Sequence, residues 1–180
     1  FFVSFFIFSF SAWGLLKKGP EGNVPVPVFS TSIPSMGCVW TIHATSIGLI
    51  DEKALTTRII SILAQYDETF SEWSPSSELR RLEVQGLTQW RSASPLFIDG
   101  LRLATELYET SHHQFDITVG RTLAGRGAPV GLGQNIEWRA AQFRFLVDPE
   151  RLTFAGLAKG MAVGSVAKLM YDAGFREFKI

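Results

Sequence analysis

The stretch that most constrains the fold covers residues 153–167, Thr-Phe-Ala-Gly-Leu-Ala-Lys-Gly-Met-Ala-Val-Gly-Ser-Val-Ala. It predicts an extended segment that turns into a helix, with Lys159 at the turn and Gly156 and Gly160 on either side. The first N–H groups of a helix have no partner inside the helix, so they attract anions, and a lysine beside them can contact a phosphate. The spacing matches neither the P-loop nor the dinucleotide motif G-x-G-x-x-G. From these residues alone, a phosphate contact and a solvated helix end both remain open.

Composition limits the class of protein. A chain of 180 residues that is 46% hydrophobic predicts one globular domain with a substantial core. Seventeen basic residues balance seventeen acidic ones and no basic run occurs, so nothing in the charge pattern supports nucleic-acid binding. A single cysteine, Cys38, excludes a disulfide framework and a Cys-based zinc site. Because the chain begins at Phe1 and ends at Ile180 inside an expected strand, we expect it to be a fragment.

The N-terminal region differs in composition from the rest of the chain. Residues 1–16 are almost wholly apolar, but they are fewer than the ~20 residues that a membrane-spanning helix needs. Residues 1–18 are therefore interpreted as a signal peptide or the end of a membrane anchor, with a buried N-terminal strand or helix as the alternative. Residues 19–34 contain four prolines and predict an extended linker, so the folded domain is expected over residues 35–180.

Hydrophobic periodicity and capping residues predict the elements of this domain. Strands are expected over residues 36–45, 143–147 and 175–180. Helices are expected over residues 51–68, from Ser94 to about residue 111, and over 158–173, with a glycine-rich loop over 123–135. Helices and strands alternate without a regular βαβ rhythm. This order predicts an α+β fold, with a mixed sheet and packed helices.

Two loops carry residues that could bind a ligand. Trp73 lies in the polar loop over residues 70–79, where an aromatic ring either covers the edge of the core, which the residues alone favour, or stacks on a planar ligand. Asp116 shares one face of a short extended stretch, residues 114–120, with Thr118. A carboxylate in an apolar run either caps the loop or contacts a ligand, and both interpretations stay open.

Four segments, in this order, resemble the ApbE family, the FAD:protein FMN transferases of bacterial flavin trafficking. They are Ser35-Met-Gly-Cys38, similar to the family's M-G-T; Phe70-Ser-Glu-Trp-Ser-Pro-Ser-Ser-Glu-Leu79, similar to F-S-x-[WY]-x-x-x-S-E-L; Phe115-Asp-Ile-Thr-Val-Gly120, similar to F-D-[IV]-T-V-G-P; and Ala158-Lys-Gly-Met-Ala-Val163, similar to A-K-G-Y-A-V-D. The resemblance covers residues 35–180, about the first half of the family's domain. It implies an ApbE-like, T-fold-like domain that is truncated here.

The resemblance also implies a site and a reaction. The residues that would line an FAD site are Met36, Trp73, Gln114, Phe115, Asp116 and Lys159. The backbone carbonyl of Gly156 would lie beside Mg²⁺, and no catalytic residue is assigned. FMN would pass from FAD to the threonine hydroxyl of an acceptor flavoprotein, and AMP would leave. With the apolar N-terminal segment, this implies an exported protein at the periplasmic face of a bacterial inner membrane.

The chain departs from the family pattern at several positions. Cys38 replaces the threonine of M-G-T, Arg121 replaces a proline, and Thr153 and Gly164 replace aspartates. The family's C-terminal half, with the Asp and Thr that complete its metal site, lies outside the resemblance, so the chain alone is expected to be inactive in transfer. The alternatives are a non-catalytic FAD-binding protein of the same fold and a membrane-tethered interaction domain that binds no flavin.

Overall fold

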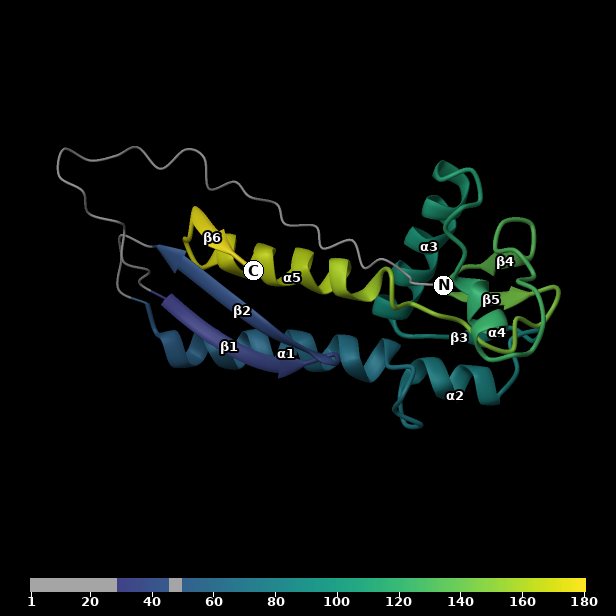
Figure 1. Cartoon of the computed structure of the whole chain (residues 1–180), viewed down its shortest axis with the longest axis horizontal. Coiled ribbons are helices and arrows are strands. Elements are labelled where there is room, and N and C mark those ends of the chain that lie inside the picture. Colours follow the sequence, from purple (N-terminus) through teal and green to yellow (C-terminus); the bar gives the residue numbers. More distant parts are fainter. Residues whose placement is uncertain (1–28, 46–49) are drawn as a thin grey trace.

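The computed structural model describes residues 29–45 and 50–180. The apolar segment over residues 1–18 and the first ten residues of the expected linker lie outside the described residues. Within the described part, no helix is both long enough and apolar enough to span a bilayer. Figure 1 shows an elongated molecule: in one half the long helices α1 (Glu52–Phe70) and α5 (Ala158–Asp172) run alongside a three-stranded sheet, and a group of shorter elements forms the other half.

The first sheet has the strand order β1-β2-β6 and is antiparallel. Strands β1 (Phe29–Ser35) and β2 (Cys38–Thr45) form a hairpin, and β6 (Glu177–Lys179) pairs with the far end of β2. Met36 and Gly37 connect the hairpin with φ values of 52° and 72°, the left-handed conformation that two-residue hairpin turns require. The predicted strand at 36–45 therefore begins two residues later, after the turn.

Strand β1 corrects the expected linker, because residues 29–34 belong to the sheet. Phe29 and Ile33 are buried while Ser30, Ser32 and Pro34 are exposed, the alternation of a half-buried strand. The proline density of this region concealed the pattern. Pro34 is tolerated because β1 is an edge strand of the described sheet.

The helices begin where their capping residues predict. The side chain of Asp51 accepts a hydrogen bond from the N–H of Ala54 at the start of α1, and Ser94 accepts one from Phe97 at the start of α3 (Pro95–Thr110). Ser77 caps the short helix α2 (Glu78–Val84). Helix α5 ends at Asp172 and is followed by Gly174 with φ 94°, as expected for a glycine just beyond a helix end.

A second antiparallel sheet has the order β3-β5-β4, with β3 (Arg91–Ser92), β5 (Gln142–Phe145) and β4 (Ile136–Arg139). Strand β5 corresponds to the strand predicted over 143–147. The α+β class is confirmed. The described strands pair antiparallel throughout, so the parallel pairs that a mixed sheet would contain do not occur among them.

Buried aromatic rings connect these elements. Phe154, which precedes α5, is fully buried, and its ring lies 4.8 Å from that of Phe70 at the end of α1 and 5.5 Å from that of Phe97 in α3, measured between centroids. Phe97 in turn stacks on Phe143 of β5 at 5.8 Å. The segment that leads into the Lys159 turn is thereby fixed to α1, α3 and the second sheet.

Gly164→Ala is expected to stabilise the protein by about 0.5–1 kcal/mol, because glycine inside a helix is less favourable than alanine by that amount. A Cβ at Gly164 would meet no atom within 4 Å. The urea midpoint of unfolding should rise with an unchanged m-value. The matched change Gly100→Ala in α3 should lower the midpoint instead, because a Cβ there would lie 2.6 Å from the Phe70 ring. A midpoint lowered by Gly164→Ala would contradict the open environment.

Candidate functional site

The turn that carries Lys159 has the geometry of an anion site. The N–H groups of Leu157 and Ala158 donate to the carbonyl of Phe154 at 2.9 and 2.8 Å. Unlike α1, α2 and α3, helix α5 starts without a side-chain cap, and within the described residues the N–H groups of Lys159 and Gly160 have no backbone partner. Lys159 and Gly160 are exposed. The start of α5 therefore presents open N–H donors and one cation to solvent.

The stretch that contains Asp116 is a turn, whereas an extended conformation was expected. Oδ1 of Asp116 accepts hydrogen bonds from the N–H and the hydroxyl of Thr118, both at 2.8 Å, and caps the 3₁₀ turn η2 (Ile117–Val119), which continues into α4 (Gly120–Leu123). An aspartate that bonds the backbone two residues further on stabilises a turn in preference to a strand. Of the two interpretations of Asp116, the capping role is confirmed, and the ligand role stays a prediction.

This turn packs directly against the segment before Lys159. The N–H of Thr153 donates to the carbonyl of Ile117 at 2.9 Å. A Cβ on Gly120 would lie 2.8 Å from the backbone carbon of Leu152, so the two backbones touch at a position where only glycine fits. Further along, a Cβ on Gly156 would lie 3.3 Å from the Phe115 ring. Residues 115–120 and 152–156 thus form one packed unit.

Trp73 does not cover the core. Trp73 is 94% exposed, so the interpretation that its ring covers the edge of the core, which its loop position alone favoured, is wrong. The loop turns away from the core because the hydroxyl of Ser71 accepts hydrogen bonds from the N–H groups of Trp73 and Ser74, at 3.4 and 3.2 Å. An exposed indole in a loop fixed by its own serines is available to a planar ligand.

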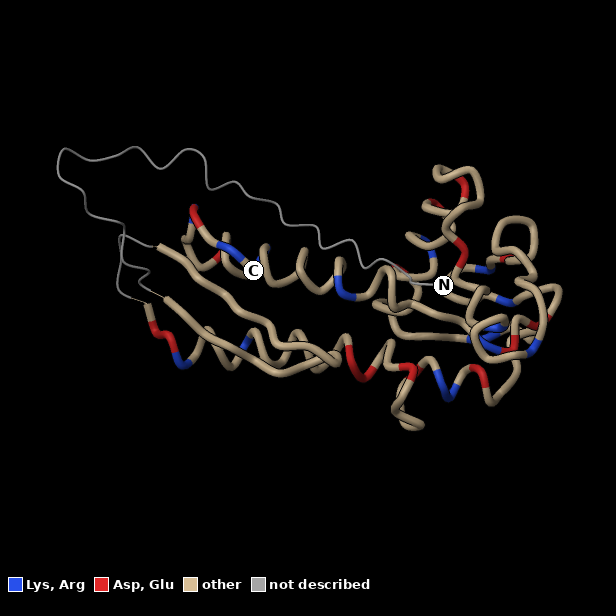
Figure 2. The backbone as a smooth tube through the Cα atoms, in the orientation of Figure 1, with Lys and Arg blue, Asp and Glu red and all other residues tan. Residues whose placement is uncertain are grey.

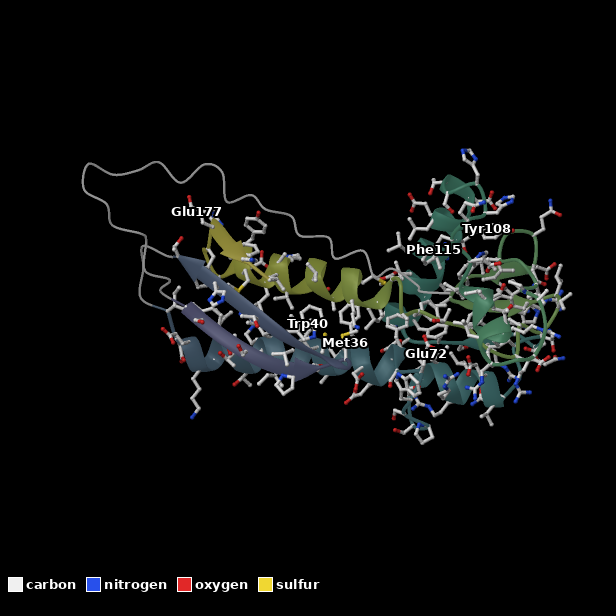
Figure 3. The ribbon with its side chains drawn as sticks, viewed as in Figure 1. Met36, Trp40, Glu72, Tyr108, Phe115 and Glu177 are labelled. Carbon is white, nitrogen blue, oxygen red and sulfur yellow. The ribbon has the colours of Figure 1, made fainter. Side chains whose placement is uncertain are left out.

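Glu72, next to Trp73, joins this loop to the Lys159 turn. Its Oε1 accepts a hydrogen bond from the hydroxyl of Thr153 at 2.6 Å, across 81 residues of sequence. Its backbone carbonyl accepts from Nε of Arg80 at 2.7 Å. Figure 3 shows Glu72 between the end of α1 and the region of Phe115. No pattern in the sequence had marked Glu72, because its partner is set by tertiary structure alone.

A buried carboxylate, that of Glu83, holds the same segments together. Its side chain is 4% exposed, pairs with Arg80 and with Arg151 (3.0 Å to Arg151), and accepts from the N–H of Leu152 at 2.8 Å. Figure 2 shows the acidic and basic residues interleaved along α2, which supplies both Arg80 and Glu83. The loop after α1 and helix α2 are therefore each bonded to residues 151–153, the loop through Glu72 and the helix through Glu83.

Met36 and Gln114 lie less centrally. Met36 is half-buried at the β1–β2 turn, and Figure 3 shows it at the end of the hairpin that points towards Glu72 and Phe115. Gln114 is exposed directly before Phe115. Neither side chain hydrogen-bonds to the segments around Thr153 within the described residues. The structure therefore brings together the segments of Trp73, Phe115, Asp116, Gly156 and Lys159, with Thr153 at their centre.

An open surface depression of about 640 Å³ lies beside this unit, between the end of α3 and the glycine-rich loop. Tyr108 and His113 stack in its wall with ring centroids 4.4 Å apart, and the N–H of Gly131 donates to the Thr118 hydroxyl at 3.2 Å. The turn capped by Asp116 is thus connected to the loop. None of the predicted site residues lines this depression.

Comparison with protein families matches residues 36–180 to the ApbE family. The chain belongs to the ApbE family. Because the match covers four-fifths of the chain, it extends well beyond the short motifs that first indicated it. A comparison with curated protein sequences finds no match.

Solved structures of ApbE proteins have the same fold. A mutant of the flavin transferase ApbE from Vibrio cholerae superposes with a TM-score of 0.74 at 21% identity, over 84% of this chain and 59% of that one. The flavinyl transferase ApbE from Pseudomonas stutzeri, in its apo form, gives 0.72 at 20% identity over 83% and 56%. The ApbE protein from Thermotoga maritima gives 0.69 at 15% identity over 81% and 53%. The chain spans little more than half of the length of these proteins.

The oxygen donors around Gly156 fit only part of an Mg²⁺ coordination shell. Gly156 is exposed in the turn, so its carbonyl could serve as a neutral ligand, and the Glu72 carboxylate is hydrogen-bonded to the hydroxyl of Thr153. Within residues 29–45 and 50–180, no group of three His, Cys, Asp or Glu side chains could hold a metal ion.

Proposed function

We propose that this ApbE chain contributes to an FAD:protein FMN transferase, which moves FMN from FAD to the threonine hydroxyl of an acceptor flavoprotein. The observation that carries the proposal is the meeting of three distant segments at Thr153. The loop of Trp73 is bonded to Thr153 through the Glu72 carboxylate, and the turn of Asp116 is bonded to Thr153 through the carbonyl of Ile117. The third segment is the one that contains Thr153 and leads into the Lys159 turn. Membership of the ApbE family and the fold shared with flavin transferases support the same assignment.

The chemistry of these groups suits a dinucleotide that contains a pyrophosphate. The open N–H groups at the start of α5 and the Lys159 ammonium suit the phosphates. Trp73, exposed in its loop, suits the flat face of a flavin or adenine ring. Gly156 is exposed and carries no side chain, so its backbone is open to close approach by a ligand, with the Phe115 ring packed beside it. Met36, Gln114 and Asp116 complete the proposed FAD site from the hairpin turn and the capped turn.

In the proposed reaction, the threonine oxygen bonds to the phosphorus of the FMN half, the bond from that phosphorus to the bridging oxygen breaks, and AMP leaves with that oxygen. The threonine proton passes to a base that this chain does not identify. Negative charge on the phosphoryl oxygens is stabilised by the Lys159 ammonium and the helix N–H groups. Bound Mg²⁺ would supply further charge neutralisation, and Gly156 would contribute a carbonyl ligand to it.

The proposed location follows from the N-terminal composition. The apolar segment over residues 1–16 supports export, with the domain at the periplasmic face of a bacterial inner membrane and residues 1–18 as signal or anchor. The acceptor flavoprotein with its target threonine would then be located on the same side of the membrane.

Incubation with FAD, Mg²⁺ and a threonine-bearing acceptor protein tests the transfer. We expect the full-length protein to leave a fluorescent flavin band on the acceptor in a denaturing gel. The control is the same acceptor with its threonine changed to alanine. Absence of the band, with saturable FAD binding, would replace the proposal by the alternative of a non-catalytic FAD-binding protein. Absence of FAD binding would contradict both and favour an interaction domain.

Two observations favour the non-catalytic alternative. Thr153 and Gly164 replace aspartates of the family pattern, and the described residues contain no three-residue metal cluster. A site without those carboxylates could still hold FAD through Lys159 and Trp73. The gel and the binding measurement together separate the two functions.

Trp73→Ala is expected to weaken FAD binding about 2- to 10-fold, because stacking on an aromatic ring contributes about 0.5–1.5 kcal/mol. Stability should change by less than about 0.5 kcal/mol, because the side chain is exposed and supports no packing. Titration of FAD fluorescence gives the affinity, and urea unfolding gives the stability. Trp73→Phe should retain most of the affinity. Equal FAD affinity in wild type and Trp73→Ala would remove Trp73 from the site.

A further inference from the structure

The Glu72 carboxylate occupies an unusual position in this molecule. It lies in a loop held on both sides: the Ser77 hydroxyl donates to the carbonyl of Ser71 at 2.7 Å, and Arg80 donates to the carbonyl of Glu72. Both contacts are to backbone, so the loop is rigid without any use of the carboxylate itself. The side chain is therefore placed at Thr153 by a loop that other bonds already secure.

The charge of this carboxylate is not neutralised within the described residues. The nearest arginines are engaged elsewhere, because Arg80 and Arg151 both pair with Glu83. Glu72 forms no ion pair there, and its side-chain hydrogen bond with Thr153 uses Oε1 alone. Because no buried side-chain oxygen of the described residues lacks a hydrogen-bond partner, the unbonded Oε2 of this half-buried residue is open to solvent. Oε2 is therefore available as an acceptor for a ligand.

The position of the charge defines which part of a ligand it can contact. Lys159 and the open N–H groups of α5 suit the phosphates, whereas a carboxylate repels them. It accepts hydrogen bonds from hydroxyl and amino groups, which FAD carries on its ribose, ribityl and adenine parts. The meeting of Glu72 with Thr153 thus places an acceptor for such donors next to a cationic turn.

We propose that Glu72 supplies the carboxylate that Thr153 lacks, and that its Oε2 accepts a hydrogen bond from a hydroxyl or amino group of FAD. The inference rests on the proposed function. In this chain the acidic group comes from the loop after α1, and Thr153 serves to hold it through the 2.6 Å hydrogen bond. The two segments are in contact although they lie 81 residues apart in the sequence.

A double-variant cycle with FAD as the probe tests this inference. Glu72→Gln keeps the shape and an acceptor for Thr153 but removes the charge, and should weaken FAD binding about tenfold, the loss expected for a charge-assisted hydrogen bond. Thr153→Asp alone should also weaken binding, because it places two carboxylates side by side. The double variant Glu72→Gln with Thr153→Asp restores one carboxylate at the same place and should bind FAD within about threefold of wild type.

The controls separate this role from a structural one and from the proposed function. Glu52→Gln, exposed at the opposite end of α1, should leave FAD affinity unchanged, and urea unfolding should show all variants folded. Full affinity in Glu72→Gln, or additive losses in the double variant, would overturn the role of Glu72 while leaving the function intact. Failure of the wild-type chain to bind FAD would overturn the function and this role together.

Discussion

Lys159→Met is expected to weaken FAD binding about 10- to 100-fold, because it removes a charge-assisted contact to phosphate worth about 1.5–3 kcal/mol. The residue is exposed at the start of α5, where it supports no packing, so the free energy of unfolding should change by less than about 0.5 kcal/mol. The affinity is measured by titration of FAD fluorescence at low and at physiological ionic strength. Wild-type affinity should fall with salt more steeply than that of the variant.

Lys168→Met is the matched control for this change. Lys168 lies on the same helix, is exposed, and pairs with Asp172 at 2.7 Å, so its removal subtracts the same charge from the far part of α5. It should leave FAD affinity unchanged. If the two variants lost equal affinity, the effect would come from net charge, and the anion site at the start of α5 would be contradicted.

Much of the fold was predictable because its signals are local. The caps at Asp51, Ser77 and Ser94 and the glycine after α5 act on neighbouring backbone, so the sequence around each is enough to locate a helix end. The apolar residues whose helical spacing predicts α1 and α3 are also largely the residues that each helix buries. These elements carry the segments that meet at the site.

The features that were missed depend on contacts between distant residues. Strand β1 follows a proline-rich stretch and contains Pro34, so its strand character is established by its pairing with β2. Trp73 is exposed because the hydroxyl of Ser71 bonds the loop backbone and turns the loop outward. The hydrophobicity of the sequence does not predict this loop direction. Glu72 is placed in the site by its hydrogen bond with Thr153, which lies 81 residues later in the chain. The sequence therefore located the segments of the site, and the tertiary contacts decided how each residue is used.

The site depends on the core beneath it. No element of secondary structure covers residues 151–154, which connect β5 to α5 along an irregular path. Their position is fixed by the bonds to Glu72, Glu83 and Ile117 and by the burial of Leu152 and Phe154. Irregular backbone of this kind holds a geometry only where packing and hydrogen bonds determine it jointly. Loss of the packing should therefore affect binding as well as stability.

Phe154→Ala is expected to destabilise the protein by about 3–5 kcal/mol, the cost of removing a fully buried aromatic side chain from a packed core. The change leaves a cavity against Phe70 and Phe97, whose rings lie within 5.5 Å of the Phe154 ring, and loosens the segment that positions Lys159. Because small domains are stable by about 5–15 kcal/mol, the variant should stay folded near 25 °C with a much lower urea midpoint. Its FAD affinity should fall together with stability, whereas Val84→Ala, at an 89% exposed position, should alter neither. Wild-type stability in Phe154→Ala would contradict the packed core. A destabilised Phe154→Ala protein that bound FAD with normal affinity would show that the Lys159 turn holds its geometry without the Phe154 ring.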